Sequence, residues 1–434
     1  MTETEQIIKR LMALHPKKMD LSLGRIERLL DQAGNPHDRL PPVIHVAGTN
    51  GKGSTIAFMR AILEAMGKRV HVYISPHLSR FHERFRLAGE LVSSERLNET
   101  MERLERINAG QPITFFELTT VVAFDLFTQV EADVVLLETG LGGRLDSTNV
   151  VKQPFGTVIT PISIDHVQFL GATIEKIAFE KAGIMKAGAK AVFARQMHDA
   201  MGVLERRAME LGITPFVGGQ DFDGYAENGR FVYQDTEGLE DLPTPNLRGH
   251  YQLSNAATAI AALRHFSLNP TSEAMETGLR TVTWPARFSP LKGELNQYLP
   301  PESELWLDGG HNVDGAKVLA QGLADLNEKS SRPLTLVLGM LANKDIRGYL
   351  AAFDGLAHRI ITVPVPDDDL ATNAGSTPEG LAQTAGELGF AATPAHSIVE
   401  ALQAVSRDGP QRVVICGSLY LAGDVLLQNK TPPQ

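Results

Sequence analysis

The sequence predicts an α/β fold in two parts, a doubly wound, mostly parallel sheet with a small β insertion and a smaller second α/β domain. Three observations lead to this prediction. Short strands of almost wholly apolar residues recur along the chain, with helical patterns between them. A glycine-rich turn at residues 48–55 follows the first of these strands. Prolines at 285 and 290 interrupt a helical pattern, and a second series of strands begins beyond them.

The first part begins with a β-branched strand at residues 43–47, which is followed by a helical spacing of apolar residues from Ile56 to Leu63. Further strands are predicted at 70–74, 133–137 and 157–160. Nearly continuous apolar strands between helices are typical of a parallel sheet that is covered on both faces. We therefore predict a P-loop-type doubly wound domain.

Between residues 220 and 249 the pattern changes to alternating aromatic side chains around Asn228-Gly229. The aromatic residues are Phe222, Tyr225, Phe231 and Tyr233. An Asn-Gly pair between alternating residues is the strongest short-range signal for a β-hairpin. This segment is the predicted β insertion.

The second part contains four predicted strands with amphipathic helical stretches between them. The strands are 305–307, 334–338, 359–363 and 412–416, and the helical stretches include 316–326 and 398–405. This alternation predicts a Rossmann-like α/β domain. The predicted boundaries are 1–288 for the first domain, 289–297 for a linker and 298–434 for the second domain.

Composition and charge exclude several classes of protein. The chain has 434 residues, 43% hydrophobic and 21% charged, which excludes a mainly disordered chain. The net charge of −10 argues against binding of nucleic acid or of anionic membranes. The single cysteine, Cys416, cannot form an internal disulfide, and no apolar run approaches the ~20 residues that span a bilayer. We expect a soluble cytoplasmic protein.

The glycine-rich turn has the chemistry of a phosphate-binding loop. Its residues are Gly48, Thr49, Asn50, Gly51, Lys52, Gly53, Ser54 and Thr55. Amides at the start of a helix attract anions, and glycines let the backbone approach a phosphate closely. Lys52 can reach terminal phosphates, and the two hydroxyls can bond phosphate or magnesium. The spacing differs from the usual P-loop because a glycine separates the lysine from the serine.

Three further side chains are predicted at the same edge of the sheet. Glu138 ends a buried strand, where a carboxylate is a natural ligand for magnesium beside a triphosphate. His166 follows the strand that ends at Thr160, and Ser75 follows the strand at 70–74. The alternatives are a glutamate in solvent, a structural histidine and a turn serine before proline.

Lys181 lies on the apolar stripe of a helix that Thr173 can cap. Burying an ammonium group is costly without a partner. The side chain can extend to solvent, pair with a phosphate, or become a carbamate that supplies oxygen ligands to a hard cation. The pattern alone does not choose among these three.

Together the motifs resemble the folylpolyglutamate synthase and dihydrofolate synthase family of the Mur ligase superfamily. The motifs occur in the family's order and extend over nearly the whole chain. They comprise residues 45–54, 75–78, 138–149, 165–166, 180–184, 255–259, 286–288 and 308–312. This combination is far more specific than any one motif.

The resemblance implies ATP and Mg²⁺ as cofactors and assigns roles to individual residues. Lys52, Lys181 and His311 match residues that take part in catalysis, and Asn255, Arg287 and Asp308 match ATP contacts. Ser75, Glu138, His166 and Lys181 match the metal ligands, with Lys181 at the position of a carbamylated lysine. The residues that match the pterin site are Asp20, Leu21, Ser22, Leu23, Thr114, Phe116, Asp146 and Ser147.

The resemblance implies an ATP-dependent ligase. It would join dihydropteroate, or a tetrahydrofolate, to L-glutamate through an acyl phosphate. We expect it to bind only small molecules and to be a monomer. The alternatives are a Mur-type ligase that acts on a peptidoglycan precursor, a nucleotide-dependent switch protein, and an α/β kinase. A kinase needs a base beside the acceptor hydroxyl, and the motifs offer metal ligands more clearly than such a base.

Overall fold

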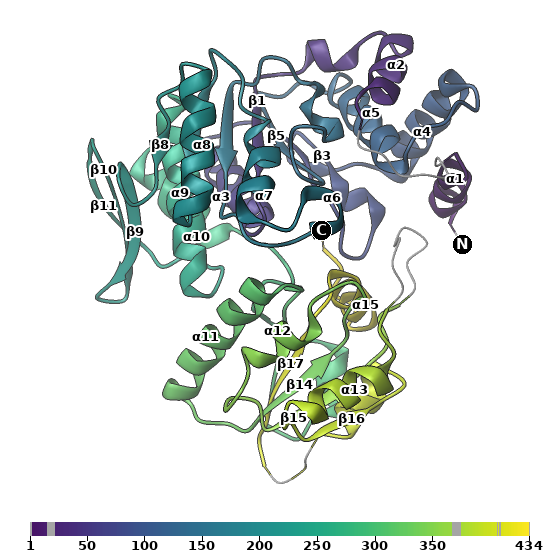
Figure 1. Cartoon of the computed structure of the whole chain (residues 1–434), viewed down its shortest axis with the longest axis vertical. Coiled ribbons are helices and arrows are strands. Elements are labelled where there is room, and N and C mark those ends of the chain that lie inside the picture. The colour runs from purple at the N-terminus through teal and green to yellow at the C-terminus, as the bar shows by residue number, and fades with distance from the viewer. Residues whose placement is uncertain (1, 15–21, 367–374, 406, 408, 434) are drawn as a thin grey trace. The chain divides into compact units, whose positions relative to one another are not determined.

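The computed structural model describes residues 2–14, 22–366, 375–405, 407 and 409–433. The chain forms two compact units (Figure 1). Unit 1 comprises Met1–Pro76, His82–Asn246 and Gln252–Thr283. Unit 2 comprises His77–Phe81, Leu247–Tyr251 and Trp284–Gln434. Two short segments that precede Trp284 in the chain thus belong to unit 2.

An eight-stranded sheet forms the centre of unit 1, in the order β4-β3-β2-β5-β1-β6-β7-β8. Its strands are β1 (Val43–Ala47), β2 (Val70–Tyr73), β3 (Phe85–Leu87), β4 (Glu90–Leu91), β5 (Val134–Glu138), β6 (Gly156–Ile159), β7 (Lys190–Phe193) and β8 (Phe216–Val217). Six neighbouring strands, β2, β5, β1, β6, β7 and β8, are parallel to one another, and β3 and β4 add an antiparallel edge. The four strands predicted in this part are all present, within one residue at each end.

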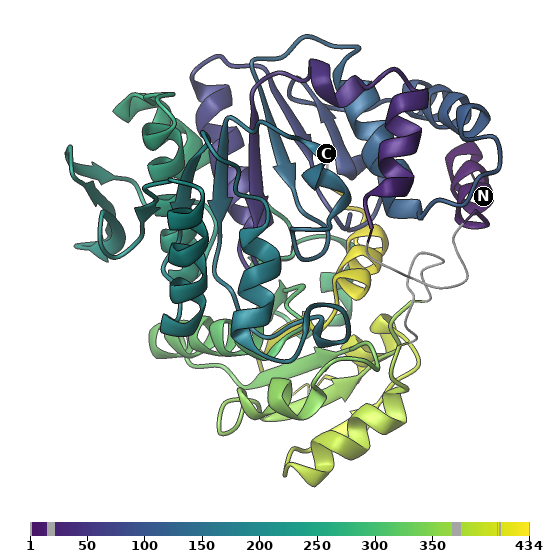
Figure 2. The same cartoon turned by 45° about the horizontal axis from the view of Figure 1, so that its top comes forward.

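Helices surround this sheet. They are α1 (Glu3–Met12), α2 (Gly24–Gln32), α3 (Lys52–Ala65), α4 (Ser94–Asn108), α5 (Phe115–Phe127), α6 (Val167–Leu170), α7 (Ile174–Ala182), α8 (His198–Glu210), α9 (His250–His265) and α10 (Ser272–Thr281), with the 3-10 helices η1 (Pro36–Arg39), η2 (Phe81–Arg84) and η3 (Ser147–Val150). Ile177 of α7 and Leu204 of α8 pack against Phe193 of β7 in one apolar cluster. Figure 2 shows α7 and α8 side by side over one face of the sheet.

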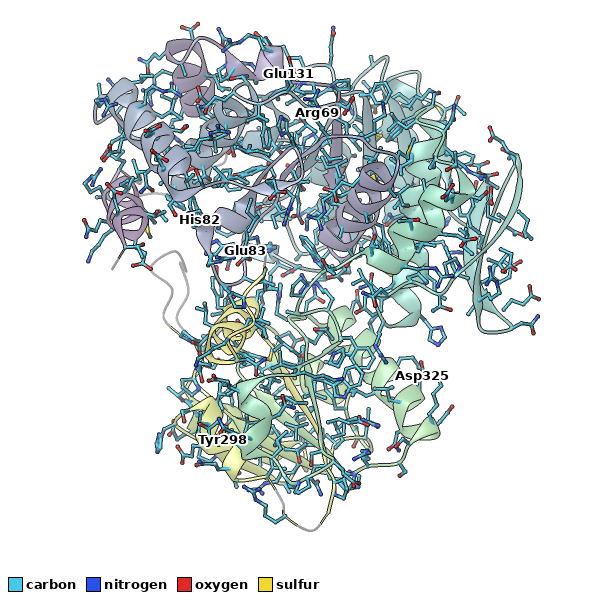
Figure 3. All side chains as sticks on the ribbon, turned by 180° about the vertical axis from the view of Figure 1, so that it is seen from behind. Arg69, His82, Glu83, Glu131, Tyr298 and Asp325 are labelled. Carbon is cyan, nitrogen blue, oxygen red and sulfur yellow. The ribbon has the colours of Figure 1, made fainter. Side chains whose placement is uncertain are left out.

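The other face of the sheet carries α3, which packs against α10 (Figure 3). Gly278 of α10 makes this close approach possible, because a Cβ there would lie 2.6 Å from Ile62 Cγ1. Figure 3 also labels Arg69 and Glu131, which form an exposed ion pair of 3.4 Å just before β2 and β5. Both faces of the sheet are therefore covered, as its apolar strands predict.

The β insertion is a three-stranded antiparallel sheet of β9 (Phe222–Glu227), β10 (Arg230–Asp235) and β11 (Gly238–Leu242). Asn228 and Gly229 form the turn between β9 and β10 with φ of 49° and 76°, as the hairpin prediction requires. The third strand, β11, was not predicted, because residues 238–242 lack the aromatic alternation. Arg264 of α9 ties the insertion to unit 1 through a 3.1 Å ion pair with Asp235.

Unit 2 contains a six-stranded sheet in the order β12-β13-β17-β14-β15-β16, parallel except for β12. Its elements are β12 (Ser289–Pro290), η4 (Glu294–Tyr298), β13 (Glu304–Leu307), α11 (Val313–Lys329), β14 (Leu334–Leu338), α12 (Ile346–Ala351), β15 (Arg359–Thr362), α13 (Pro378–Glu387), β16 (Ala392–Pro394), α14 (Ile398–Gln403), β17 (Arg412–Cys416) and α15 (Leu419–Gln428). Apolar side chains pack on both faces of this sheet. The Rossmann-like fold is confirmed.

The segment 247–251 is fastened within unit 2 by its polar side chains. The guanidinium of Arg248 lies 5.4 Å from the ring centre of Trp306, and His250 Nε2 lies 3.1 Å from Asp325 Oδ2 on α11 (Figure 3). The predicted linker, residues 289–297, contributes β12 and part of η4 to the same unit. The boundary at residue 288 stays a prediction.

In the part of the chain that the structure describes, no helix has the length and apolar character needed to cross a bilayer.

Candidate functional site

The predicted phosphate-binding loop joins β1 to α3, and two glycines shape it. Gly48 has a φ of +154°, and a Cβ there would lie 1.8 Å from Thr160 Oγ1. Gly51, which precedes α3, has a φ of +87°, and a Cβ there would lie 2.5 Å from Asn255 Oδ1. Both positions therefore require glycine, and the backbone passes close to β6 and α9.

We expect Gly48→Ala to lower the free energy of unfolding by about 2–4 kcal/mol, because it adds a steric clash to a strained φ. Urea unfolding measures this change. Gly67→Ala is the matched control, since Gly67 also has a positive φ, of +76°, but among the described residues, its chain neighbours aside, no atom lies within 4 Å of a Cβ there. Equal losses in the two variants would contradict the importance of the Thr160 contact.

Hydrogen bonds fasten the loop to the segment that follows β6. The backbone N–H groups of Thr49 and Asn50 donate to the carbonyl of Pro161 over 2.9 and 3.2 Å. Thr49 Oγ1 donates to the carbonyl of Ser163 and accepts from its N–H. The first N–H groups of a helix have no partner within it. The fixed loop therefore presents the amides of the start of α3 to an anion.

Two lysine side chains meet at the carbonyl of Gly48. Lys52 Nζ donates to this oxygen over 3.2 Å, and Lys181 Nζ donates to it over 2.8 Å. Lys181 lies on α7, whose N-cap is Thr173, and only 5% of its surface is exposed. Burial, together with the nearby charge of Lys52, lowers the pKa of Lys181 to about 7. The interpretation that Lys181 extends to solvent is therefore wrong. Pairing with a phosphate and formation of a carbamate stay predictions.

Glu138 and Ser75 lie together beside this loop. Glu138 ends β5 and is buried, with Oε1 3.9 Å from Lys52 Nζ. Its other oxygen accepts a 3.2 Å hydrogen bond from the backbone N–H of Ser75. Ser75 Oγ is buried and has no hydrogen-bond partner among the described residues. The alternative that Glu138 lies in solvent is therefore wrong. The buried hydroxyl of Ser75 and the carboxylate of Glu138 together offer oxygen ligands to a hard cation.

This pair fits a magnesium site that is completed by phosphate and water. Among the residues that the structure describes, no three His, Cys, Asp or Glu side chains gather closely enough to hold a metal by themselves. Magnesium commonly keeps several waters and takes one or two carboxylates with substrate phosphates. His166 lies at the N-terminus of α6 with a φ of 51°, and its Nε2 is 3.9 Å from Asp165 Oδ2. Its role in metal binding stays a prediction.

The start of α9 also borders the phosphate loop. Asn255 is buried, and its amide nitrogen donates to Gln252 Oε1 over 3.0 Å. Gln252 Nε2 in turn donates to Ser54 Oγ over 3.3 Å. Sequence reasoning missed Gln252, although its position three residues before Asn255 places both amides on one helix face. Thr55 Oγ1, at the start of α3, is buried and has no partner within the described chain.

The loop after β5 is built around the buried carboxylate of Asp146. One oxygen accepts from the N–H groups of Gly140 and Leu141, and the other accepts from the N–H and hydroxyl of Thr148. Burial raises the pKa of Asp146, although these hydrogen bonds act in the opposite direction. Ser147, next in the chain, is buried at the start of η3. Asp146 therefore fixes the shape of the loop.

The same loop is joined to the end of α7, the helix that carries Lys181. Arg144 forms a 2.9 Å ion pair with Glu180, and its N–H donates to the Glu180 carbonyl. Asn149 Nδ2 donates to the carbonyl of Gly183 over 3.2 Å. The position of Lys181 is therefore linked to the shape of this loop.

The start of α5 lies next to it. Thr114 caps α5 and forms a capping box with Glu117. Phe116 packs on Gly140, where a Cβ would lie 2.4 Å from its ring. Arg25 of α2 forms a 2.9 Å ion pair with the buried Glu117, a contact that sequence reasoning missed. Of the four predicted residues that precede Arg25, Leu23 is the N-cap of α2 and Ser22 precedes it, while Asp20 and Leu21 lie outside the described residues.

In unit 2, Asp308 follows β13 and is buried. Its two oxygens accept 2.8 and 2.7 Å hydrogen bonds from the N–H groups of Phe288 and Gly310. Burial raises the pKa of Asp308, against the influence of the Arg287 guanidinium. His311 Nδ1 lies 3.1 Å from the Gly309 carbonyl, just before α11. Asp308 therefore holds together the segments that carry Arg287 and His311.

Family models match both parts of the chain. Residues 46–263 match the model "Mur ligase middle domain". Residues 293–428 match the model "Dihydrofolate synthetase, C-terminal domain". The two matches include the phosphate loop, Lys181 and Asn255 in unit 1 and Asp308 in unit 2.

Individual proteins resemble the chain over almost its full length. The folylpolyglutamate synthase of Lacticaseibacillus casei is 34% identical over 92% of this chain and 92% of its own length. The structure of "E.coli FolC in complex with DHPP and ADP" has a TM-score of 0.87 and 31% identity, covering 98% of this chain and 97% of that one. A bifunctional folylpolyglutamate synthase/dihydrofolate synthase with Mn, AMPPNP and L-glutamate bound has a TM-score of 0.84 and 32% identity, covering 97% and 96%. The chain is therefore an ATP-dependent ligase that belongs to the folylpolyglutamate synthase and dihydrofolate synthase family of the Mur ligase superfamily.

Proposed function

We propose that this ligase joins the carboxylate of dihydropteroate, or of a reduced folate, to the amine of L-glutamate with release of ADP and phosphate. The observation that carries the proposal is the meeting of Lys52 and Lys181 at the Gly48 carbonyl, beside Glu138 and Ser75. These groups lie where a triphosphate and a divalent cation would bind. L-glutamate, AMPPNP and Mn are bound together in one similar structure, which supports the choice of substrates.

We infer that residues 48–55 bind the phosphates of the nucleotide and that Asn255 contacts the nucleotide from α9. Arg287 and Asp308 are assigned as ATP contacts from the family resemblance alone. Ser75, Glu138, His166 and Lys181 would hold Mg²⁺, the last of them as a carbamate. Bound Mg²⁺ would neutralise charge on the phosphates during transfer.

The reaction depends mainly on the positioning of the substrates and on stabilisation of negative charge on the transferred phosphoryl group. A carboxylate is a poor acyl donor, so its oxygen first takes the γ-phosphoryl group, and the amine of glutamate then displaces phosphate from the acyl carbon. The ammonium of Lys52 and the amides of the start of α3 stabilise negative charge on the transferred group. We assign His311 a part in catalysis from the family resemblance alone. This sequence of steps needs no nucleophile from the protein.

The acceptor would bind at the loop after β5 and the start of α5. Thr114, Phe116, Asp146 and Ser147 lie there, and Ser22 and Leu23 belong to α2, which Arg25 ties to α5. We assign the pterin ring to this place and include Asp20 and Leu21 from the sequence alone. We also infer that the protein works as a monomer in the cytoplasm, in keeping with its single, buried cysteine.

Parallel assays with two acceptors test the proposal. With Mg²⁺ and ATP, we expect ADP to form only when L-glutamate is present together with 7,8-dihydropteroate or tetrahydrofolate. The comparison also determines whether one or both activities are present. Absence of ADP above background with either acceptor would contradict the proposal, and so would ADP release that does not depend on an acceptor, which is the behaviour of a switch protein.

A further inference from the structure

His45 is a buried residue of unit 1 for which the assignments above give no role. It lies on β1, three residues before Gly48, and is fully buried. Burial lowers the pKa of His45 to about 3, so its imidazole is neutral. Its Nδ1 has no hydrogen-bond partner within the described residues. An unpaired buried acceptor costs free energy that an apolar residue would avoid. A histidine at this position therefore suggests that its second nitrogen, Nε2, makes a contact that offsets this cost.

The other nitrogen begins a short chain of hydrogen bonds. His45 Nε2 lies 2.8 Å from Thr148 Oγ1, and the hydroxyl of Thr148 donates to Asp146 Oδ1. Three backbone N–H groups also donate to Asp146, so its carboxylate acts as the acceptor. Thr148 has one proton to give and gives it to Asp146. Nε2 of His45 must therefore carry the proton that it donates to Thr148, which fixes the tautomer of the imidazole.

This chain of bonds leads from the sheet to the loop where the acceptor is proposed to bind. Asp146 accepts hydrogen bonds from the N–H groups of Gly140 and Leu141, and Gly140 is in contact with the ring of Phe116. Thr148 is the second residue of η3, directly after Ser147. His45 thus joins β1, the strand that ends in the phosphate loop, to the loop that carries Asp146 and Ser147.

We propose that His45 is a positioning residue for the acceptor, acting through Thr148 on Asp146 and Ser147. The inference rests on the proposed function, because it assigns the acceptor to this loop. His45 touches no substrate. Its Nε2–H holds the hydroxyl of Thr148 toward Asp146, which sets the conformation of residues 140–148 before the acceptor binds.

Steady-state kinetics of paired variants test this inference. Thr148→Val removes the hydroxyl with little change in shape, and His45→Phe removes the donor but keeps a planar ring. Each is expected to raise the KM for dihydropteroate about 10-fold, the loss typical of one buried hydrogen bond, with a smaller change in kcat. The double variant is expected to be no worse than the poorer single variant, because the two residues act as one unit. ADP affinity, measured by calorimetry, should change less than 2-fold in all of them.

Two conservative variants and one control separate positioning from folding. His45→Gln, whose amide can reach the place of Nε2–H, and Thr148→Ser should restore most of the acceptor affinity. His71→Phe removes another buried imidazole, on β2, whose Nε2 bonds the carbonyl of Val130. It should leave the acceptor KM within about 2-fold of the wild type, since the described contacts of the His71 ring are with Val130, Ala88 and Phe127 and not with the loop 140–148.

The outcomes are distinct. If wild-type protein turns over dihydropteroate but Thr148→Val and His45→Phe leave its KM unchanged, the inference fails and the proposed function stands. An equal weakening of ADP binding, or independent effects that multiply in the double variant, would also overturn it. A wild-type protein that neither binds nor uses dihydropteroate would overturn the proposed function and this inference together.

Discussion

Lys181→Ala is expected to lower the rate of ligation at least about 100-fold, the loss typical of one group that stabilises transition-state charge. The amine is buried and lies 2.8 Å from the carbonyl of the phosphate loop. Only an uncharged amine reacts with carbon dioxide to give a carbamate. Because burial lowers the pKa of Lys181 to about 7, its amine is uncharged near neutral pH far more often than that of a lysine of ordinary pKa.

Chemical rescue distinguishes the two remaining roles of Lys181. If the residue works as a carbamate, short carboxylic acids such as acetate should partly restore turnover in Lys181→Ala, because they return oxygen ligands to the metal. If it works as a cation beside a phosphate, small amines should restore turnover instead. Lys186→Ala is the control, since Lys186 is a half-buried lysine just beyond the same helix. Wild-type turnover in Lys181→Ala would contradict any functional role.

The carbamate interpretation also predicts the direction of the pH dependence. Below pH 7 the amine takes up a proton, so its uncharged fraction falls about tenfold for each pH unit. Activity of the wild-type enzyme should therefore fall below pH 7, and added bicarbonate should partly restore it. Activity that stays constant down to pH 5.5 would contradict this interpretation of Lys181.

Lys52→Met is expected to lower kcat by about 10³-fold, because the ammonium group stabilises charge that develops on the transferred phosphoryl group. Its Nζ lies at the Gly48 carbonyl and 3.9 Å from Glu138, so it is held in place before the nucleotide binds. The loss should be larger in kcat than in the affinity for ATP, since the interaction strengthens in the transition state. Single-turnover phosphoryl transfer and equilibrium ATP binding measure the two effects.

Lys68→Ala is the matched control for Lys52→Met. Lys68 lies just beyond the other end of α3, where it forms a largely exposed 3.8 Å ion pair with Asp133. Exposed pairs of this kind contribute little to stability. Its loss should leave both kcat and ATP affinity near the wild-type values. If kcat of Lys52→Met stays within about 3-fold of the wild type, the helix amides alone stabilise the negative charge on the transferred phosphoryl group, and the role assigned to Lys52 is wrong.

The sequence predicted the central strands well because their apolar runs have a simple periodicity. The strands 43–47 and 334–338 match β1 and β14 at both ends. Strands at the edges were harder to predict. β3 has only three residues, and β11 is mostly polar and exposed, so their pairing partners decide their conformation.

The helical stripe predicted that Lys181 continues the side that faces the core, but it left open whether the ammonium group extends to solvent. The hydrogen bond of Lys181 to Gly48 was not predictable, since the two residues are 133 positions apart in the chain. The contacts of Gln252 and Arg25 were missed for a similar reason. Each acts through a distant partner, Ser54 and Glu117 respectively, and only the folded chain brings these pairs together.

Isotope transfer from a labelled acceptor tests the central claim most directly. When dihydropteroate carries ¹⁸O in its carboxylate, activation by ATP places one of those oxygens between the acyl carbon and phosphorus. Attack by the amine of L-glutamate then expels phosphate with that oxygen. We predict one ¹⁸O atom in each phosphate released during amide formation, measured by mass spectrometry. Phosphate without ¹⁸O, formed together with the amide, would contradict an acyl phosphate and with it this account of the site.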